Sequence, residues 1–310
     1  MTEASSQPPI DTRNLDFEWI RQEVEAANGS FYETEHHVIT HVPGQERLVV
    51  SFDNLASLEA QGPRKPWGYE MVRERQWGSL GVMIKAKDWF RSIELSSYLT
   101  ELRDQGLFSS YPAVSMYGSS MGGYGACLFA PLAPGCTVVA FAPQSSLSAQ
   151  DAPFEKRYRY ARRNYDWTRP EWRDAAQGLP HAGKAYLIYD PTVSEDQLHA
   201  RRLHGSKVID LAWPDLTHKV PPSLKRMGIL KPVSLGMLEG SMTKTQFHKL
   251  LRVRMKTSVY VHRMLERASA KGHHALVEQA ISGLPTDVVN WKIRQLRRQN
   301  SRMAHAVPAL

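Results

Sequence analysis

The chain has 310 residues, which is enough for one large domain with an appendage, and its 42% hydrophobic and 23% charged residues are typical of a soluble globular enzyme. No run of about 18 apolar residues is present, so a membrane span is not expected. The net charge of +8 is uneven: positions 241–310 hold 13 Lys and Arg against 3 Asp and Glu, whereas positions 1–240 hold 26 against 28. The basic character is therefore a property of the tail and not of a site in the first 240 residues.

The N-terminus and the cysteines bear on the compartment. Residues 1–10 are polar and contain proline without an apolar core, which does not fit a secretory signal. Cys127 and Cys136 belong to no Cys-x-x-Cys or metal-binding pattern, so buried thiols in a reducing environment are expected. These features predict a cytoplasmic protein.

The apolar pattern along the chain predicts an α/β architecture. Residues 1–30 are expected to form a flexible segment that contains one short helix at 15–27. Short β-like runs then alternate with helix-length segments, which is the rhythm of a parallel sheet. These runs span 32–42, 47–52, 80–84, 113–117, 137–142, 184–189 and 207–213.

The clearest motif lies where the run at 113–117 ends. Gly118-Ser119-Ser120-Met121-Gly122 follows this run, and a helix is predicted directly after it. Strand, Gly-x-Ser-x-Gly and helix together are the context of a nucleophile elbow, in which small neighbours leave room for a strained turn. Ser120 would present its hydroxyl at the helix N-terminus, where the backbone N–H of Met121 can meet an oxyanion.

The segment Gly118–Ala126 resembles the elbow of α/β-hydrolase serine esterases, and the layout of residues 48–227 is similar to theirs. The resemblance implies a mostly parallel, doubly wound sheet with a cap, and a second oxyanion N–H from the loop after the third strand. That loop begins at Asp53-Asn54 and lacks the His-Gly-Gly-Gly form. Asp53, Asn54 or Leu55 would have to supply the amide, and Asn54 is taken as the candidate.

The resemblance also implies an acid and a histidine later in the chain, in the order Ser, acid, His. Ser120 needs a base to accept its proton, and His218 lies in the loop after the last predicted strand. Two acids compete for the role of orienting His218. Asp190 closes a strand, whereas Asp196 lies in the first turn of a helix, where the helix dipole alone would favour it. Asp190 is narrowly preferred.

Two regions fall outside the sheet. Residues 145–182 mix arginines with aromatic side chains, which predicts a cap that binds a large anionic substrate. The alternative is a helical excursion with a solvated basic face, and binding of nucleic acid is not expected.

Residues 241–302 predict a basic helical appendage, with a long helix from Thr243 or Thr245 to about Ala270. It would contact an acidic partner or simply present a solvated face. A disordered tail is expected at 303–310.

Together these features predict a serine hydrolase that acts on a small ester or an acylated glycan through an acyl-enzyme. The glycan is predicted as a substrate because the chain also bears a fainter likeness to proteins of bacterial polysaccharide synthesis. The alternative is a non-catalytic binding or assembly protein that keeps the fold and uses the cap and tail for partner contacts. No metal or organic cofactor is implied, because neither a ligand cluster nor a Gly-x-Gly-x-x-Gly after a strand is present.

Overall fold

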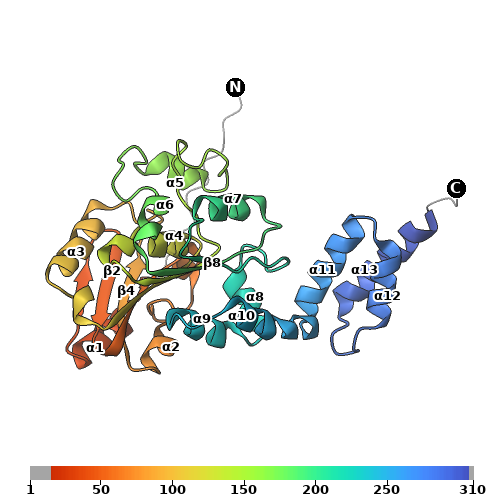
Figure 1. Ribbon diagram of the computed structural model, residues 1–310, viewed down its shortest axis with the longest axis horizontal. Helices are drawn as coiled ribbons and strands as arrows, with labels where there is room; N and C mark the ends of the chain where they lie inside the picture. Colours follow the sequence, from red (N-terminus) through yellow and green to blue (C-terminus); the bar gives the residue numbers. More distant parts are fainter. Residues whose placement is uncertain (1–14, 307–310) are drawn as a thin grey trace.

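Residues 15–306 are described by a computed structural model, in which one twisted sheet forms the centre of the main domain (Figure 1). Across this range eight strands pair in the order β1-β2-β4-β3-β5-β6-β7-β8. β2 is antiparallel to β1 and β4, and the pairings from β4 through β8 are parallel. The strands are β1 Ser30–Glu33, β2 His37–Val42, β3 Gln45–Phe52, β4 Trp77–Ile84, β5 Ala113–Ser119, β6 Thr137–Phe141, β7 Lys184–Ile188 and β8 Val208–Asp210.

This strand order, with an antiparallel second strand and the third and fourth strands exchanged, is that of the α/β-hydrolase fold. The predicted fold class is confirmed. Two strand predictions were inexact. The run at 32–42 is divided between β1 and β2 by a tight turn in which the Thr34 hydroxyl accepts from the backbone N–H of His37. The last strand covers only three of the residues predicted at 207–213.

Helices cover both faces of the sheet (Figure 1). On one face, α3 (Ile93–Asp104), α4 (Met121–Leu128) and α6 (Ala175–Gly178) bury apolar side chains against the strands. On the other face, α8 (Val220–Arg226), α9 (Leu230–Leu238) and α10 (Lys244–Leu250) do the same, together with the short α2 (Tyr69–Arg73). Alternate residues of β5 serve the two faces: Met116 belongs to the first cluster and Tyr117 to the second.

The described part of the predicted flexible segment is packed rather than loose. Helix α1 (Glu18–Ala26) buries Ile20 and Val24 against β2 and the start of the main domain. The amphipathic spacing of these two residues explains why the helix docks on the sheet. The remainder of that segment, residues 1–14, lies outside the described residues, as do residues 307–310 of the predicted tail.

The region predicted as a cap lies above the sheet, beside α4 and α7 (Ser194–Arg202) (Figure 1). It holds little regular structure beyond α5 (Arg159–Asn164) and α6. Arg91 anchors it by donating to four of its carbonyl oxygens, those of Asp166, Arg169, Glu171 and Trp172. The guanidinium has five N–H donors in a fixed plane, so one side chain can bind several carbonyl oxygens of this irregular segment at once.

The predicted long basic helix is wrong. Thr243 does begin a helix, with a capping box to Gln246, but that helix is the short α10. A 3₁₀ segment at Leu251–Lys256 then separates it from α11 (Ser258–Ala270). The break arises because the two parts pack differently: Phe247 of α10 joins the core of the main domain, whereas α11 gives Tyr260 to that core but packs Val261 and Leu265 in a separate cluster with α12 (His274–Ser282) and α13 (Trp291–Ala306).

The three C-terminal helices project from the body of the molecule (Figure 1). Within residues 15–306, no helix combines the length and apolar character needed to cross a membrane.

Candidate active site

Ser120 stands in a strained turn between β5 and α4. Its φ of 53° and ψ of −119° lie outside the regions that a non-glycine residue ordinarily adopts. The flanking glycines make this turn possible. A Cβ on Gly118 would lie 2.1 Å from the carbonyl oxygen of Gly122, and a Cβ on Gly122 would lie 2.2 Å from that of Phe52. The Gly-x-Ser-x-Gly pattern is therefore a steric requirement of this turn.

Ser120, His218 and Asp196 form a continuous chain of hydrogen bonds. The Ser120 Oγ lies 2.9 Å from His218 Nε2, and His218 Nδ1 lies 2.8 and 3.0 Å from the two carboxylate oxygens of Asp196. Because a carboxylate only accepts, His218 donates from Nδ1, and its Nε2 is left free to accept the Ser120 proton. Asp196 is fully buried, whereas His218 is partly exposed.

The narrow preference for Asp190 is not supported by this geometry. One oxygen of Asp190 accepts from the backbone N–H and the hydroxyl of Thr192, and the other accepts from the backbone N–H of Thr217 at 2.7 Å. Asp190 therefore holds the loop one residue before His218, while Asp196 contacts the imidazole itself.

The acid is also bound to the cap. Arg157 donates from Nη1 to Asp196 at 2.8 Å and from its other nitrogens to Glu155. Burial acts to lower the pKa of Arg157, but its hydrogen bonds to Glu155 and the charge of Asp196 outweigh this and raise it. The guanidinium therefore stays charged and fixes the orientation of the Asp196 carboxylate.

Glu155 connects this pair to a second buried histidine. The backbone N–H of Ser145 donates to His199 Nδ1 at 3.0 Å, so the ring donates from Nε2 to Glu155, also at 3.0 Å. Burial opposes ionisation of Glu155, but the hydrogen bonds from His199 and Arg157 lower its pKa to about 2. The base of the cap is thus fixed to α7, the helix that carries Asp196.

Tyr158 of the cap and Gln144, which directly precedes the cap, lie beside the serine and the histidine. The Tyr158 hydroxyl lies 3.3 Å from His218 Nε2, and Gln144 lies 3.5 Å from the Ser120 Oγ while donating to Tyr158 at 3.2 Å. Burial raises the pKa of Tyr158, so its hydroxyl stays protonated at neutral pH and can donate. Trp89 packs edge-on against the Tyr158 ring, with 4.7 Å between ring centroids, and holds it in place.

The candidate oxyanion donors differ in whether their backbone N–H groups are already hydrogen-bonded. Met121 is the first residue of α4, so its backbone N–H has no acceptor within the helix. The Asp53 N–H donates to the Val82 carbonyl and is engaged in the sheet. The Asn54 N–H has only a long bond, 3.4 Å, to the Ser57 hydroxyl. Met121 and Asn54 therefore remain the predicted donors.

The loop that carries His218 is held from the C-terminal side as well. Asp215 and Thr217 both have positive φ, 67° and 63°. The Asp215 carboxylate accepts two bonds of 2.8 Å from Arg267 on α11, and its carbonyl oxygen accepts from Arg263 at 3.3 Å. The first helix of the appendage therefore braces a strained loop three residues from the histidine.

Sequence reasoning found Ser120, His218 and both acids, but not Gln144, Arg157 and Tyr158 as neighbours of the catalytic groups. The residue types of the cap were visible, but no local spacing indicates which of its side chains reach the serine. Among residues 15–306, no group of three or more His, Cys, Asp or Glu is arranged to hold a metal ion.

No protein-family model matches the chain, and no curated protein is significantly similar to it. Several solved structures are similar in outline. The capsule O-acetyltransferase of Neisseria meningitidis serogroup A is 12% identical over 67% of this chain and 94% of its own, with a TM-score of 0.43. The carboxylesterase EstE1 from a metagenomic library is 14% identical over 78% and 100%, with 0.45. The serine hydrolase FphF of Staphylococcus aureus is 13% identical over 68% and 97%, with 0.44.

Proposed function

We propose that the protein is a serine hydrolase that cleaves acyl esters through a Ser120–His218–Asp196 triad. The observation that carries the proposal is the pair of contacts at His218, 2.9 Å to the serine oxygen and 2.8 Å to the carboxylate. A serine hydroxyl is a poor nucleophile at neutral pH, and a base in hydrogen-bond contact with it is the arrangement that activates it.

In the proposed reaction Ser120 attacks the ester carbonyl as His218 takes its proton. The developing oxyanion is met by the N–H of Met121 and by a second donor from the loop after β3, with Asn54 the candidate. His218 then returns the proton to the departing alcohol, which leaves an acyl group on Ser120. Water attacks this ester by the same steps, and the free acid and the original serine are restored.

The cap residues have supporting roles in this scheme. Arg157 orients Asp196, so that the carboxylate keeps His218 in the tautomer that accepts at Nε2. The protonated Tyr158 hydroxyl, 3.3 Å from Nε2, is placed to bind the oxygen of the departing alcohol. Trp89, Tyr158 and Gln144 together limit the access of water to the serine.

A non-catalytic role for the fold is the weaker alternative. Holding a serine at a φ of 53° costs on the order of 1–3 kcal/mol, which a pure binding protein has no reason to retain. Strain of this kind is usual where backbone geometry serves a reaction.

The proposal is tested by hydrolysis of a series of chromogenic esters, from acetate to octanoate, by wild type and Ser120→Ala. We expect turnover by wild type with transient addition of the acyl mass to the protein, and neither in the folded variant. A variant that retains turnover within about tenfold of wild type would remove Ser120 as the nucleophile.

A further inference from the structure

A hollow of about 690 Å³ opens on the cap, apart from the catalytic serine. Its walls come from residues 147–150, from α5 with the turn before it, and from residues 167–173. Within the described chain its lining includes five Lys or Arg side chains and no Asp or Glu: Lys156, Arg159, Arg162, Arg163 and Arg173. We call this feature the basic hollow.

Most of this positive charge is not neutralised by the protein. Arg173 pairs with Asp151 behind the wall, and Arg162 donates to the carbonyl oxygen of Glu155. Lys156, Arg159 and Arg163 are exposed and have no carboxylate within ion-pair distance among residues 15–306. Like charges that converge on a concave surface repel one another and raise the local potential, and a bound anion relieves this.

The hollow shares its backbone with the catalytic site. Arg157 contacts Asp196, and the Tyr158 hydroxyl lies beside His218. Lys156 immediately precedes this pair and Arg159 immediately follows it, and both line the hollow. Residues 156–159 therefore contribute both to the surroundings of the triad and to the wall of the hollow.

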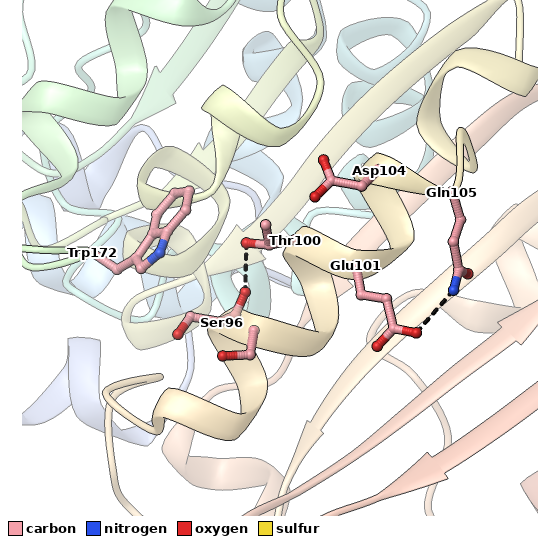
Figure 2. Close-up of a pocket in the computed structure, with 7 residues that line it drawn as sticks. Ser96, Thr100, Glu101, Asp104, Gln105 and Trp172 are labelled. Atoms are coloured by element: carbon pink, nitrogen blue, oxygen red, sulfur yellow. Dashed lines mark hydrogen bonds between the residues drawn. The ribbon is translucent and has the colours of Figure 1, made fainter.

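A second hollow, at the edge of the cap, carries the opposite charge. It lies along α3 and is closed on one side by Trp172 of the cap (Figure 2). Glu101 and Asp104 line it, so it repels the ligands that the basic hollow attracts.

We propose that the basic hollow binds the phosphate or carboxylate groups of an anionic substrate. The claim that an anion binds depends only on the basic hollow. The claim that this anion is part of the substrate rests on the proposed hydrolase activity. Guanidinium groups bind such anions with two parallel N–H bonds, and three uncompensated cations suit a ligand with more than one anionic group. The ester to be cleaved would then be carried by a polyanionic molecule.

Binding is measured first, by calorimetry with the full chain in low salt. Tripolyphosphate and trigalacturonate, used separately, distinguish the phosphate from the carboxylate form of the ligand. The test variant carries Arg159→Glu and Arg163→Glu. The matched control carries Arg294→Glu and Arg298→Glu, exposed positions of α13 that change the net charge equally. We expect affinity for at least one probe to fall more than about tenfold in the test variant and less than about twofold in the control.

Equal losses in both variants would show attraction by net charge only and would overturn the proposal, as would the absence of binding to wild type. The second measurement compares an acetylated sugar phosphate with the uncharged acetylated sugar as ester substrates. We expect the ratio of their kcat/KM values to fall at least about tenfold in the test variant and to stay unchanged in the control.

The two arms separate the two proposals. Binding that depends on Arg159 and Arg163 without turnover of any ester would leave the hollow as an anion site and contradict the hydrolase. Turnover without such binding would leave the hydrolase and overturn the anion site.

Discussion

Replacing Arg267 with glutamine should loosen the loop that carries His218 and slow the reaction without touching the site itself. Arg267 binds the Asp215 carboxylate with two bonds of 2.8 Å, and Asp215 is almost fully buried at a backbone φ of 67°. Its hydrogen bonds to Asp215 raise the pKa of Arg267, so the guanidinium stays charged. Its removal leaves the buried Asp215 carboxylate without the two hydrogen bonds that Arg267 donates.

The size of the effect follows from the exposure of the two partners. Breaking a fully buried ion pair costs about 3–5 kcal/mol, and breaking an exposed one costs about 0.2–1 kcal/mol. The side chain of Asp215 is 4% exposed and that of Arg267 is 37% exposed, so the loss of stability should be about 1–2 kcal/mol. Misplacing a catalytic base by an ångström can cost about 100-fold, so we expect kcat to fall about 10- to 100-fold.

The assay is hydrolysis of a chromogenic acetate ester, with thermal unfolding measured on the same samples. Arg297→Gln is the matched control, because Arg297 pairs with Glu278 within the appendage and does not contact the main-domain loop. We expect the control to keep wild-type kcat. The kcat of Arg267→Lys should be intermediate, because lysine keeps the positive charge but cannot bind the carboxylate with two parallel N–H groups. Wild-type kcat in folded Arg267→Gln, or an equal loss of kcat in the control, would refute the claim that Arg267 holds the His218 loop in place.

Four further substitutions test other parts of the site. Asp196→Asn should lower kcat about 10³- to 10⁴-fold by releasing the tautomer of His218, whereas Asp190→Asn should cost less than about tenfold; equal losses would leave the acid unassigned. Tyr158→Phe should lower kcat more for esters of poor leaving groups than for activated ones, and a uniform effect would remove its contact with the departing alcohol. Glu155, whose pKa is lowered from 4.5 to about 2, stabilises the fold above pH 4.5, and this contribution is lost as the pH falls toward 2. Chemical denaturation of Glu155→Gln should therefore show a weaker pH dependence in that range, by on the order of 2 kcal/mol, and a curve parallel to wild type would contradict this.

The elements that sequence reasoning predicted well depend on local chemistry. Gly118 is required by a close contact with the carbonyl oxygen of Gly122 inside the elbow, and Gly122 by one with the carbonyl oxygen of Phe52 on the neighbouring strand. Both glycines lie within two residues of Ser120 in the chain, so the elbow is visible as a motif in the sequence. The helix start at Thr243, one of the two threonines considered, is set by a local capping box with Gln246. The alternation of short apolar runs with helical segments predicted a parallel α/β sheet, and the α/β-hydrolase form of that sheet came from the resemblance of the elbow.

The remaining features depend on contacts between distant segments. Asp190 and Asp196 both follow β7 closely, and only the path of the His218 loop determines which carboxylate meets the imidazole. Arg157 is 39 residues from Asp196 in sequence, so no spacing rule connects them. The predicted long C-terminal helix failed because tertiary packing on two separate cores outweighed a continuous helical pattern.

The central claim is that Ser120 is activated by His218. Labelling of wild type and Ser120→Ala with a fluorophosphonate, read by intact mass, tests this directly, because the probe reacts only with a serine whose base is in place. The structure predicts one adduct on wild type and none on the variant. A folded wild-type protein that takes up no label, or a variant that is labelled equally, would contradict it.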